Sequence, residues 1–203
     1  MFKSKFLVVV LALIFSINSL SAEVTESIKS TFTKKIDSAI EVAKNKTVDK
    51  ETRNNKIVDI MAPMFDFELM ARLTLGKKVW KSLSKEKRKE FTKLYVKRME
   101  NSYSSKVDAY TEEQVVIRNI KRDKKNRITL ITDVVDQDNK ISMIYKYYKP
   151  KKNKQGKEEW LVYDVNILGV SIIKTDKSQF KEILKNGTID ELMSKMTIVK
   201  EKQ

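Results

Sequence analysis

The apolar residues of this chain change their spacing twice, near residues 114 and 168, and these changes restrict the fold more than any other feature. Before residue 114 they recur every three or four positions, which is typical of amphipathic helices. From residue 114 to about residue 168 they recur at every second position, as in strands, and helical spacing then returns. Helices followed by consecutive strands and more helices predict an α+β fold rather than alternating α/β units.

Four helices are predicted before residue 114. The first carries one apolar stripe, made by Val24, Ile28, Phe32, Ile36, Ile40 and Ala43. Asp49 is the expected N-cap of the second, which should end before Pro63 because the residue before a proline disfavours helical backbone. Asp66 is expected to cap a third helix, ended by Gly76, and Ser84 to open the fourth. The core positions of that fourth helix are Phe91, Leu94, Tyr95, Met99 and Tyr103.

Four strands are predicted, over 114–121, 127–135, 140–148 and 159–168. Their short connections favour an antiparallel meander. Both faces carry apolar side chains: in the second strand Ile128 and Leu130 lie on one face and Ile131 on the other. The stretch DVNILGVSII, at 164–173, is also apolar on both sides of Gly169. Such a sheet requires helices on both faces or an enclosed cavity.

Two helices are predicted after the sheet. Asp176 or Ser178 is expected to start the first, which ends at Gly187. Thr188 and Glu191 have the spacing of a capping box for the second. We therefore expect N-terminal helices, a four-stranded meander sheet and C-terminal helices.

The first 22 residues have the pattern of a cleaved secretory signal. Lys3 and Lys5 precede an apolar run from residue 6 to 17, and the small residues of SLSA at 19–22 form a cleavage site. We predict a signal peptide at 1–22 and a single domain at 23–203, exported to the periplasm. The absence of cysteine excludes a lipid anchor on cysteine and any disulfide.

The chain is strongly basic, with a formal net charge of +15 that falls to +13 once Lys3 and Lys5 are removed. Such a charge attracts polyanions. The lysines are scattered rather than gathered in a stripe with aromatic residues, and export argues against a nucleic-acid partner. A solvated basic surface is therefore the preferred interpretation.

The chain lacks the catalytic residues that several classes of enzyme need. The chain has no histidine and no cysteine, which removes the Ser-His-Asp arrangement, thiol nucleophiles and the common zinc ligands. Its four glycines do not form a phosphate-binding loop. We expect no enzymatic activity, no cofactor and no metal.

Two segments resemble the MlaC family of periplasmic phospholipid-binding proteins, also called the toluene-tolerance family. The first is FDFELMARLTLGKKVWKSLSKEKRKEF at 65–91, and the second is WLVYDVNILGVSIIKTDKSQFKEILKNGTIDEL at 160–192. The second departs from the family pattern at Asp176 and Lys177, where members tend to have an aromatic residue and an arginine.

The resemblance implies a monomeric carrier that holds phospholipid acyl chains in a cavity between sheet and helices. It implies shuttling between an outer-membrane lipoprotein complex and an inner-membrane ABC transporter with an MCE-domain ring, and so a part in outer-membrane lipid asymmetry. Two alternatives stay open: a hopanoid or other polycyclic lipid as cargo, and an exported adaptor with a filled core that binds only protein.

Ten residues are candidates for the lipid-binding lining. They are Met70, Leu73, Leu94, Tyr95 and Met99 on helices, and Tyr145, Tyr147, Leu168, Val170 and Ile172 on strands. Trp80 and Trp160 are interpreted as structural, because a large amphipathic ring more often seals a core. Four lysines could face an anionic head group or a partner, although a solvated turn is the preferred interpretation: Lys146, Lys149, Lys151 and Lys152.

Overall fold

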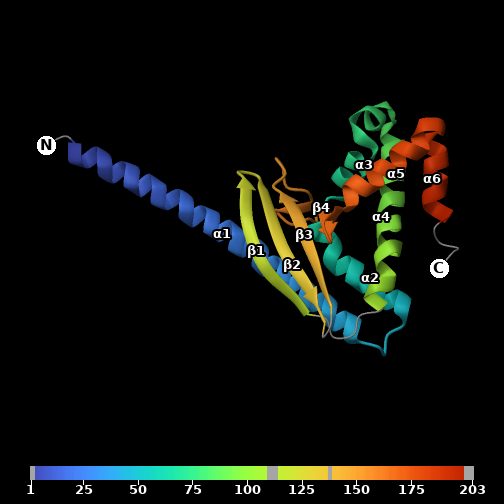
Figure 1. The fold of residues 1–203 in the computed structure, drawn as a ribbon, viewed down its shortest axis with the longest axis horizontal. Helices are drawn as coiled ribbons and strands as arrows, with labels where there is room; N and C mark the ends of the chain where they lie inside the picture. The colour runs from blue at the N-terminus through green and yellow to red at the C-terminus, as the bar shows by residue number, and fades with distance from the viewer. Residues whose placement is uncertain (1–2, 109–113, 137–138, 199–203) are drawn as a thin grey trace.

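The computed structural model describes the backbone of residues 3–108, 114–136 and 139–198, and the side chains of 22–100, 114–136 and 139–197. The predicted core position Tyr103 lies outside the described side chains. Helices precede and follow an antiparallel sheet, which confirms the α+β fold (Figure 1). The elements are α1 (Lys3–Lys44), α2 (Lys50–Met61), η1 (Ala62–Met64), α3 (Phe67–Ser82), α4 (Lys85–Asp108), β1 (Gln114–Lys124), β2 (Arg127–Val135), β3 (Lys140–Tyr148), β4 (Leu161–Ile167), β5 (Val170–Ser171), α5 (Ile172–Asn186) and α6 (Ile189–Ile198).

Helix α1 is longer than the apolar stripe predicts. It starts at Lys3, inside the predicted signal peptide, and its first half projects away from the rest of the molecule (Figure 1). Its second half lies along the sheet, where Ile28 and Phe32 are buried. The boundary between 1–22 and 23–203 therefore remains a prediction.

Local capping signals explain where four helices begin. The Asp49 carboxylate accepts a hydrogen bond from the Thr52 amide (2.9 Å), and the Asp66 carboxylate accepts one from the Leu69 amide (3.1 Å). The Ser84 hydroxyl accepts one from the Lys87 amide (3.1 Å). The capping box is also present, with hydrogen bonds from the Thr188 amide to Glu191 (2.9 Å) and from the Glu191 amide to Thr188 (3.2 Å).

Helix α3 continues past Gly76, where the sequence predicts that it ends. Gly76 has φ 75° and ψ 162°, so the helix is kinked there and resumes up to Ser82. The resumed segment buries Trp80, which is 8% exposed in the core made by α3, α4, α5 and α6. Burial of that ring favours the second helical segment.

In the described residues the sheet has five strands, one more than predicted, in the order β1-β2-β3-β4-β5 with antiparallel neighbours. The extra strand arises because the stretch at 164–173 turns back on itself. Leu168 (φ 50°) and Gly169 (φ 83°) form a two-residue hairpin turn with both φ positive, and Ile167 pairs with Val170.

Helix α5 begins earlier than predicted, at Ile172 rather than at Asp176 or Ser178. Ser171 is its N-cap and accepts a hydrogen bond from the Lys174 amide (3.1 Å). The Asp164 carboxylate fixes this junction, because it accepts hydrogen bonds from the Ser171 hydroxyl (2.9 Å) and the Ile173 amide (3.3 Å).

One face of the sheet is more deeply buried than the other. In β2, Ile128 and Leu130 lie on one face and are 1% and 0% exposed. Ile131 lies on the opposite face and is only half-buried. The buried face packs on Ile28, Phe32 and Met64 in a second core, distinct from the core between the C-terminal helices. In the middle of the sheet, one face is therefore covered less completely than the other.

Candidate functional site

A cavity of about 360 Å³ lies between the sheet and the helices α1, α2 and α4. Its size is within the usual range of about 300–1,000 Å³ for small-molecule sites. Almost all of its lining is apolar, and the only polar side chains among the described lining are Asn54 and Glu100. The apolar lining consists of Ile36, Ala39, Ile57, Val58, Met61, Ala62, Phe65, Phe67, Met99, Met143, Tyr145, Val165, Ile167 and Ile172.

The strand side of the cavity follows from the register between β3 and β4. Met143 and Tyr145 are two residues apart and therefore share a face, as do Val165 and Ile167. The register places Met143 opposite Ile167 and Tyr145 opposite Val165. Two cross-strand pairs thus give a continuous apolar surface.

The helical side follows from 3.6-residue spacing. Ile36 and Ala39 lie three residues apart on α1, and Ile57 and Met61 lie four apart on α2, so each pair projects from one face of its helix. Helices α1 and α2 are in contact, which brings these two faces together. Met99 and Glu100 add the side formed by α4.

Tyr145 is an apolar lining residue despite its hydroxyl group. Its ring packs edge-to-face on Phe32 with a centroid distance of 4.9 Å, and its hydroxyl lies 3.6 Å from the Met143 sulfur. Burial raises the pKa of Tyr145 to about 12. The phenol is therefore neutral throughout the physiological range.

The two polar lining residues mark one side of the cavity, between α2 and α4. The Asn54 Oδ1 atom is buried and has no hydrogen-bond partner in the described part of the chain. Burial raises the pKa of Glu100, with an opposing effect of the Lys97 ammonium and a further increase from the Asp59 carboxylate. This side can accept polar atoms of a ligand that is otherwise hydrocarbon.

The structure brings three of the ten candidate lining residues to the cavity: Met99, Tyr145 and Ile172. Four others, Met70, Leu73, Leu94 and Tyr95, belong to the separate core between α3, α4, α5 and α6. Tyr147 lies beside a small hollow of about 50 Å³ that Trp160 also lines. Leu168 and Val170 are 65% and 59% exposed, because Leu168 lies in the hairpin turn and Val170 is the first residue of the short edge strand β5.

Tyr95 and Asp176 have a structural role in this chain. The Tyr95 hydroxyl donates a hydrogen bond to the Asp176 carboxylate (3.1 Å), and Arg98 donates a second one (3.2 Å). Asp176 is 5% exposed, so its departure from the family pattern is accommodated by two partners on α4. The hydrogen bond between Tyr95 and Asp176 therefore joins α4 to α5 within the core.

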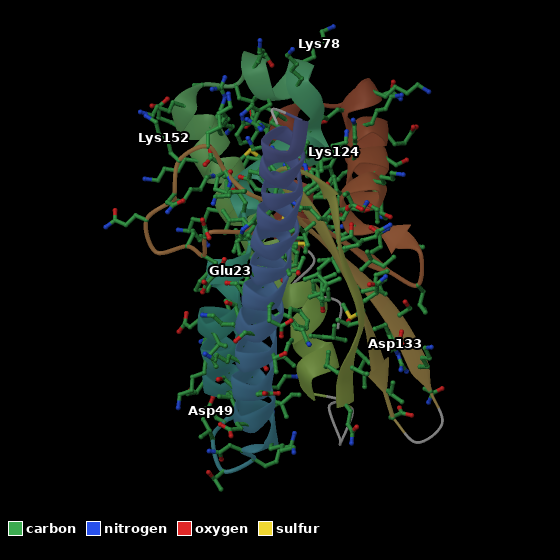
Figure 2. The ribbon with its side chains drawn as sticks, turned by 90° about the vertical axis from the view of Figure 1, so that its left-hand side faces the viewer. Glu23, Asp49, Lys78, Lys124, Asp133 and Lys152 are labelled. Atoms are coloured by element: carbon green, nitrogen blue, oxygen red, sulfur yellow. The ribbon has the colours of Figure 1, made fainter. Side chains whose placement is uncertain are left out.

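The four candidate lysines do not gather at the cavity. Lys146 forms an ion pair with Asp164 (3.1 Å), and Lys149 forms one with Glu159. Lys151 and Lys152 are exposed in the connection between β3 and β4, and Figure 2 shows Lys152 on the opposite side of the molecule from Asp133 of β2. Lys149, Lys151 and Lys152 therefore agree with a solvated turn, whereas Lys146 lies within β3 and not in a turn.

Sequence reasoning missed the contribution of α1 and α2 to the cavity. Ile36 and Ile57 were identifiable as apolar positions on amphipathic helices, but helical spacing does not distinguish a side chain that fills a core from one that borders a cavity. Val165 and Ile167 carried a stronger signal, because they alternate on the strand that precedes Leu168.

Within the part of the chain that the structure describes, no helix is both long enough and apolar enough to cross a membrane. A family model described as "MlaC protein" matches residues 30–197. One similar protein is the intermembrane phospholipid transport system binding protein MlaC of Haemophilus influenzae, which is 31% identical over 137 residues. That alignment covers 67% of this chain and 63% of the relative, so the chain spans slightly less than two thirds of the relative's length.

A solved structure has the same fold. It is the phospholipid-binding protein from Ralstonia solanacearum, in complex with a phospholipid, and the TM-score is 0.71 at 18% sequence identity. The match covers 83% of this chain and 93% of that chain. Because the family model also matches most of the sequence, including both segments that carry the resemblance, the chain belongs to the MlaC family.

Proposed function

We propose that this protein is a periplasmic phospholipid carrier that holds acyl chains in the cavity between β3, β4, α1, α2 and α4. The observation that carries the proposal is the lining of this cavity, which is apolar apart from Asn54 and Glu100. A water-filled cavity would need several polar partners for each water molecule, whereas this lining suits hydrocarbon. The Haemophilus influenzae and Ralstonia solanacearum relatives support the choice of phospholipid as cargo.

The proposed mechanism is shielding of hydrocarbon from water. Each buried methylene contributes about 0.8 kcal/mol, so a diacyl lipid with roughly 28 methylenes would cost on the order of 20 kcal/mol in water. At about 30 Å³ per water-sized group, a cavity of about 360 Å³ accommodates roughly a dozen methylenes. A whole diacyl lipid therefore requires the helices to move apart from the sheet as the chains enter.

The polar residues set the orientation in this proposal. Asn54 and Glu100 lie on the α2 and α4 side, so the ester and head-group atoms are placed there and the acyl chains extend toward Met143, Tyr145 and Val165. The buried Asn54 Oδ1 atom is an acceptor, so it gains a hydrogen-bond partner when an N–H or O–H donor of the head group is present. No chemical reaction on the lipid is needed.

The direction of lipid transport has to come from docking partners. A cavity that solvates acyl chains about as well as a bilayer makes transfer nearly neutral in free energy, so the carrier alone does not set direction. We assign the two partners to an outer-membrane lipoprotein complex and an inner-membrane ABC transporter with an MCE-domain ring.

The test is the lipid content of protein purified from the periplasm without detergent. Organic extraction and native mass spectrometry should return phospholipid with two acyl chains in a near one-to-one ratio with protein. A fused-ring terpenoid would instead identify a polycyclic cargo on the same fold. Repeated preparations without any lipid would contradict the proposal and favour an adaptor that binds only protein.

A further inference from the structure

Three large hydrophobic side chains are exposed in the described part of the chain, and they lie together. They are Ile141 (41% exposed), Leu168 (65%) and Val170 (59%). Leu168 lies in the turn between β4 and β5, Val170 directly follows that turn, and the Leu168 amide donates a hydrogen bond to the Ser142 carbonyl, next to Ile141 (2.9 Å). We call these three residues the apolar tip.

Folding does not account for a leucine at position 168. Leu168 has φ 50°, a conformation that asparagine, aspartate and glycine adopt more readily than a bulky residue, and asparagine before glycine is the favoured sequence for this turn. Its side chain is exposed, so packing does not compensate for the backbone strain. A Cβ atom at Gly169 would also meet no atom within 4 Å, so the turn stands clear of the rest of the protein.

The apolar tip is continuous with the cavity. Ile167 and Ile172, on either side of the turn, line the cavity itself. A neighbouring depression of about 250 Å³ includes Val170 and shares Met99, Ile167 and Ile172 with the cavity. An acyl chain that leaves the cavity on this side passes from Ile172 to Val170, along a depression that Arg98, Thr175, Asp176 and Gln179 also line.

The charges near the tip favour an anionic partner. Lys174, in the first turn of α5, is exposed, and the side chain of Lys140, next to Ile141, is 60% exposed. The nearby carboxylates of Asp133, Asp164 and Asp176 are at most 5% exposed and are each paired with a basic side chain. Asp136, in the connection before Lys140, is half-buried, and its carboxylate accepts a hydrogen bond from the Asn139 amide (2.7 Å). The whole chain adds a formal net charge of +15.

We propose that the apolar tip inserts shallowly into an anionic phospholipid surface while the carrier takes up or releases lipid. This inference rests on the proposed function, because it assigns the place where the same cavity meets its source of lipid. The three side chains of the apolar tip are far fewer than the roughly 20–30 residues per partner in a stable protein interface. Shallow insertion of a few apolar side chains with flanking lysines matches the physics of an interfacial anchor.

The test compares the wild type with a Leu168→Asn, Val170→Thr double variant in sedimentation with vesicles. The vesicles contain phosphatidylglycerol and phosphatidylcholine in equal parts, or phosphatidylcholine alone. The wild type should bind the anionic vesicles more strongly, and the double variant should bind them about tenfold more weakly. Ile131→Thr, on the less covered face of β2, is the matched control and should bind like the wild type.

Two further readouts keep the outcome unambiguous. Thermal unfolding should show the double variant at least as stable as the wild type, because asparagine suits the positive φ at position 168. Lipid extracted from the purified proteins reports on the cavity separately, so a protein without lipid would contradict the proposed function and not the tip.

Equal vesicle binding by the double variant and the wild type would overturn the assignment of the tip. A wild type that sediments with neither vesicle would overturn it as well and would leave a protein partner as the occupant.

Discussion

Replacement of Ala39 by phenylalanine should block lipid binding without unfolding the protein. Ala39 is half-buried on α1 and lines the cavity, where it faces open space rather than packed atoms. The Ala39→Phe substitution adds six carbon atoms at the site that we assign to acyl chains. Because the cavity accommodates roughly a dozen methylene-sized groups, the new ring occupies about half of it.

The Ala39→Phe substitution should weaken lipid binding but stabilise the empty protein. Displacing about six methylenes at about 0.8 kcal/mol each removes on the order of 5 kcal/mol of lipid-binding free energy, which weakens affinity by more than about a thousandfold. The empty protein gains buried apolar surface at the same time, so its free energy of unfolding should rise by up to about 2 kcal/mol.

The assay is phosphate and acyl-chain analysis of purified protein, together with thermal unfolding followed by circular dichroism. Ser38→Phe is the matched control, because Ser38 is the adjacent residue on α1 and is exposed. The control should carry lipid at the wild-type level. An Ala39→Phe protein that is folded and still carries the full amount of lipid would refute the placement of the acyl chains, and one that cannot fold would show that position 39 faces packed core.

Three other predictions follow from features away from the lining of α1. Intact mass of the exported protein should give an N-terminus near Ala22 or Glu23 in the osmotic-shock fraction, and a membrane-bound product that keeps Met1 would contradict this. Thr188→Ala should lower the free energy of unfolding in urea by about 1 kcal/mol, because the α6 capping box is lost; an unchanged midpoint and slope would argue against that contribution. Burial acts to raise the pKa of Asp66, but hydrogen bonds from Tyr148, Lys154 and the Leu69 amide outweigh it and hold the pKa below its usual value. The ionised form therefore stabilises the fold above about pH 4, and this stability is lost as the pH falls through the lowered pKa. Asp66→Asn should make urea stability less dependent on pH in that range, and an unchanged dependence would assign the acid sensitivity to other groups.

The signals that predicted the fold correctly are local ones. Asp49, Asp66 and the pair Thr188 and Glu191 act within three or four residues of themselves, so their caps are determined by adjacent sequence. The meander was also predictable, because its connections are short. These interactions need no information about distant parts of the chain.

The prediction failed where a local signal was unusual. The two-residue turn at Leu168 was not predicted, because asparagine is the common residue before glycine at that position, and so Val170 of β5 and Ile172 at the start of α5 were interpreted as strand residues that follow Leu168. The kink at Gly76 was likewise interpreted as an end, since the burial of Trp80 in the next turn depends on tertiary packing.

The candidate site was predicted only in part for the same physical reason. Met99, Tyr145 and Ile172 border the cavity, but Met70 and Tyr95 have the same helical spacing and pack in the other core. The difference arises from how α4 contacts α6 and α3 along one part of its length and α2 along another. Hydrophobic periodicity identifies a buried face and carries no information on whether that face meets a neighbour.

The cavity joins segments that are far apart in the chain, and this has a consequence for the order of folding. Each strand of the sheet pairs with its neighbour in sequence, so the meander can form from short-range contacts. The cavity needs Ile36 of α1 beside Ile172 at the start of α5, and this closure of a long loop is entropically slower. Because the chain is synthesised from its N-terminus, the apolar sides of α1 and β3 are present before their partners, and the chain needs protection from aggregation until its last quarter has been made.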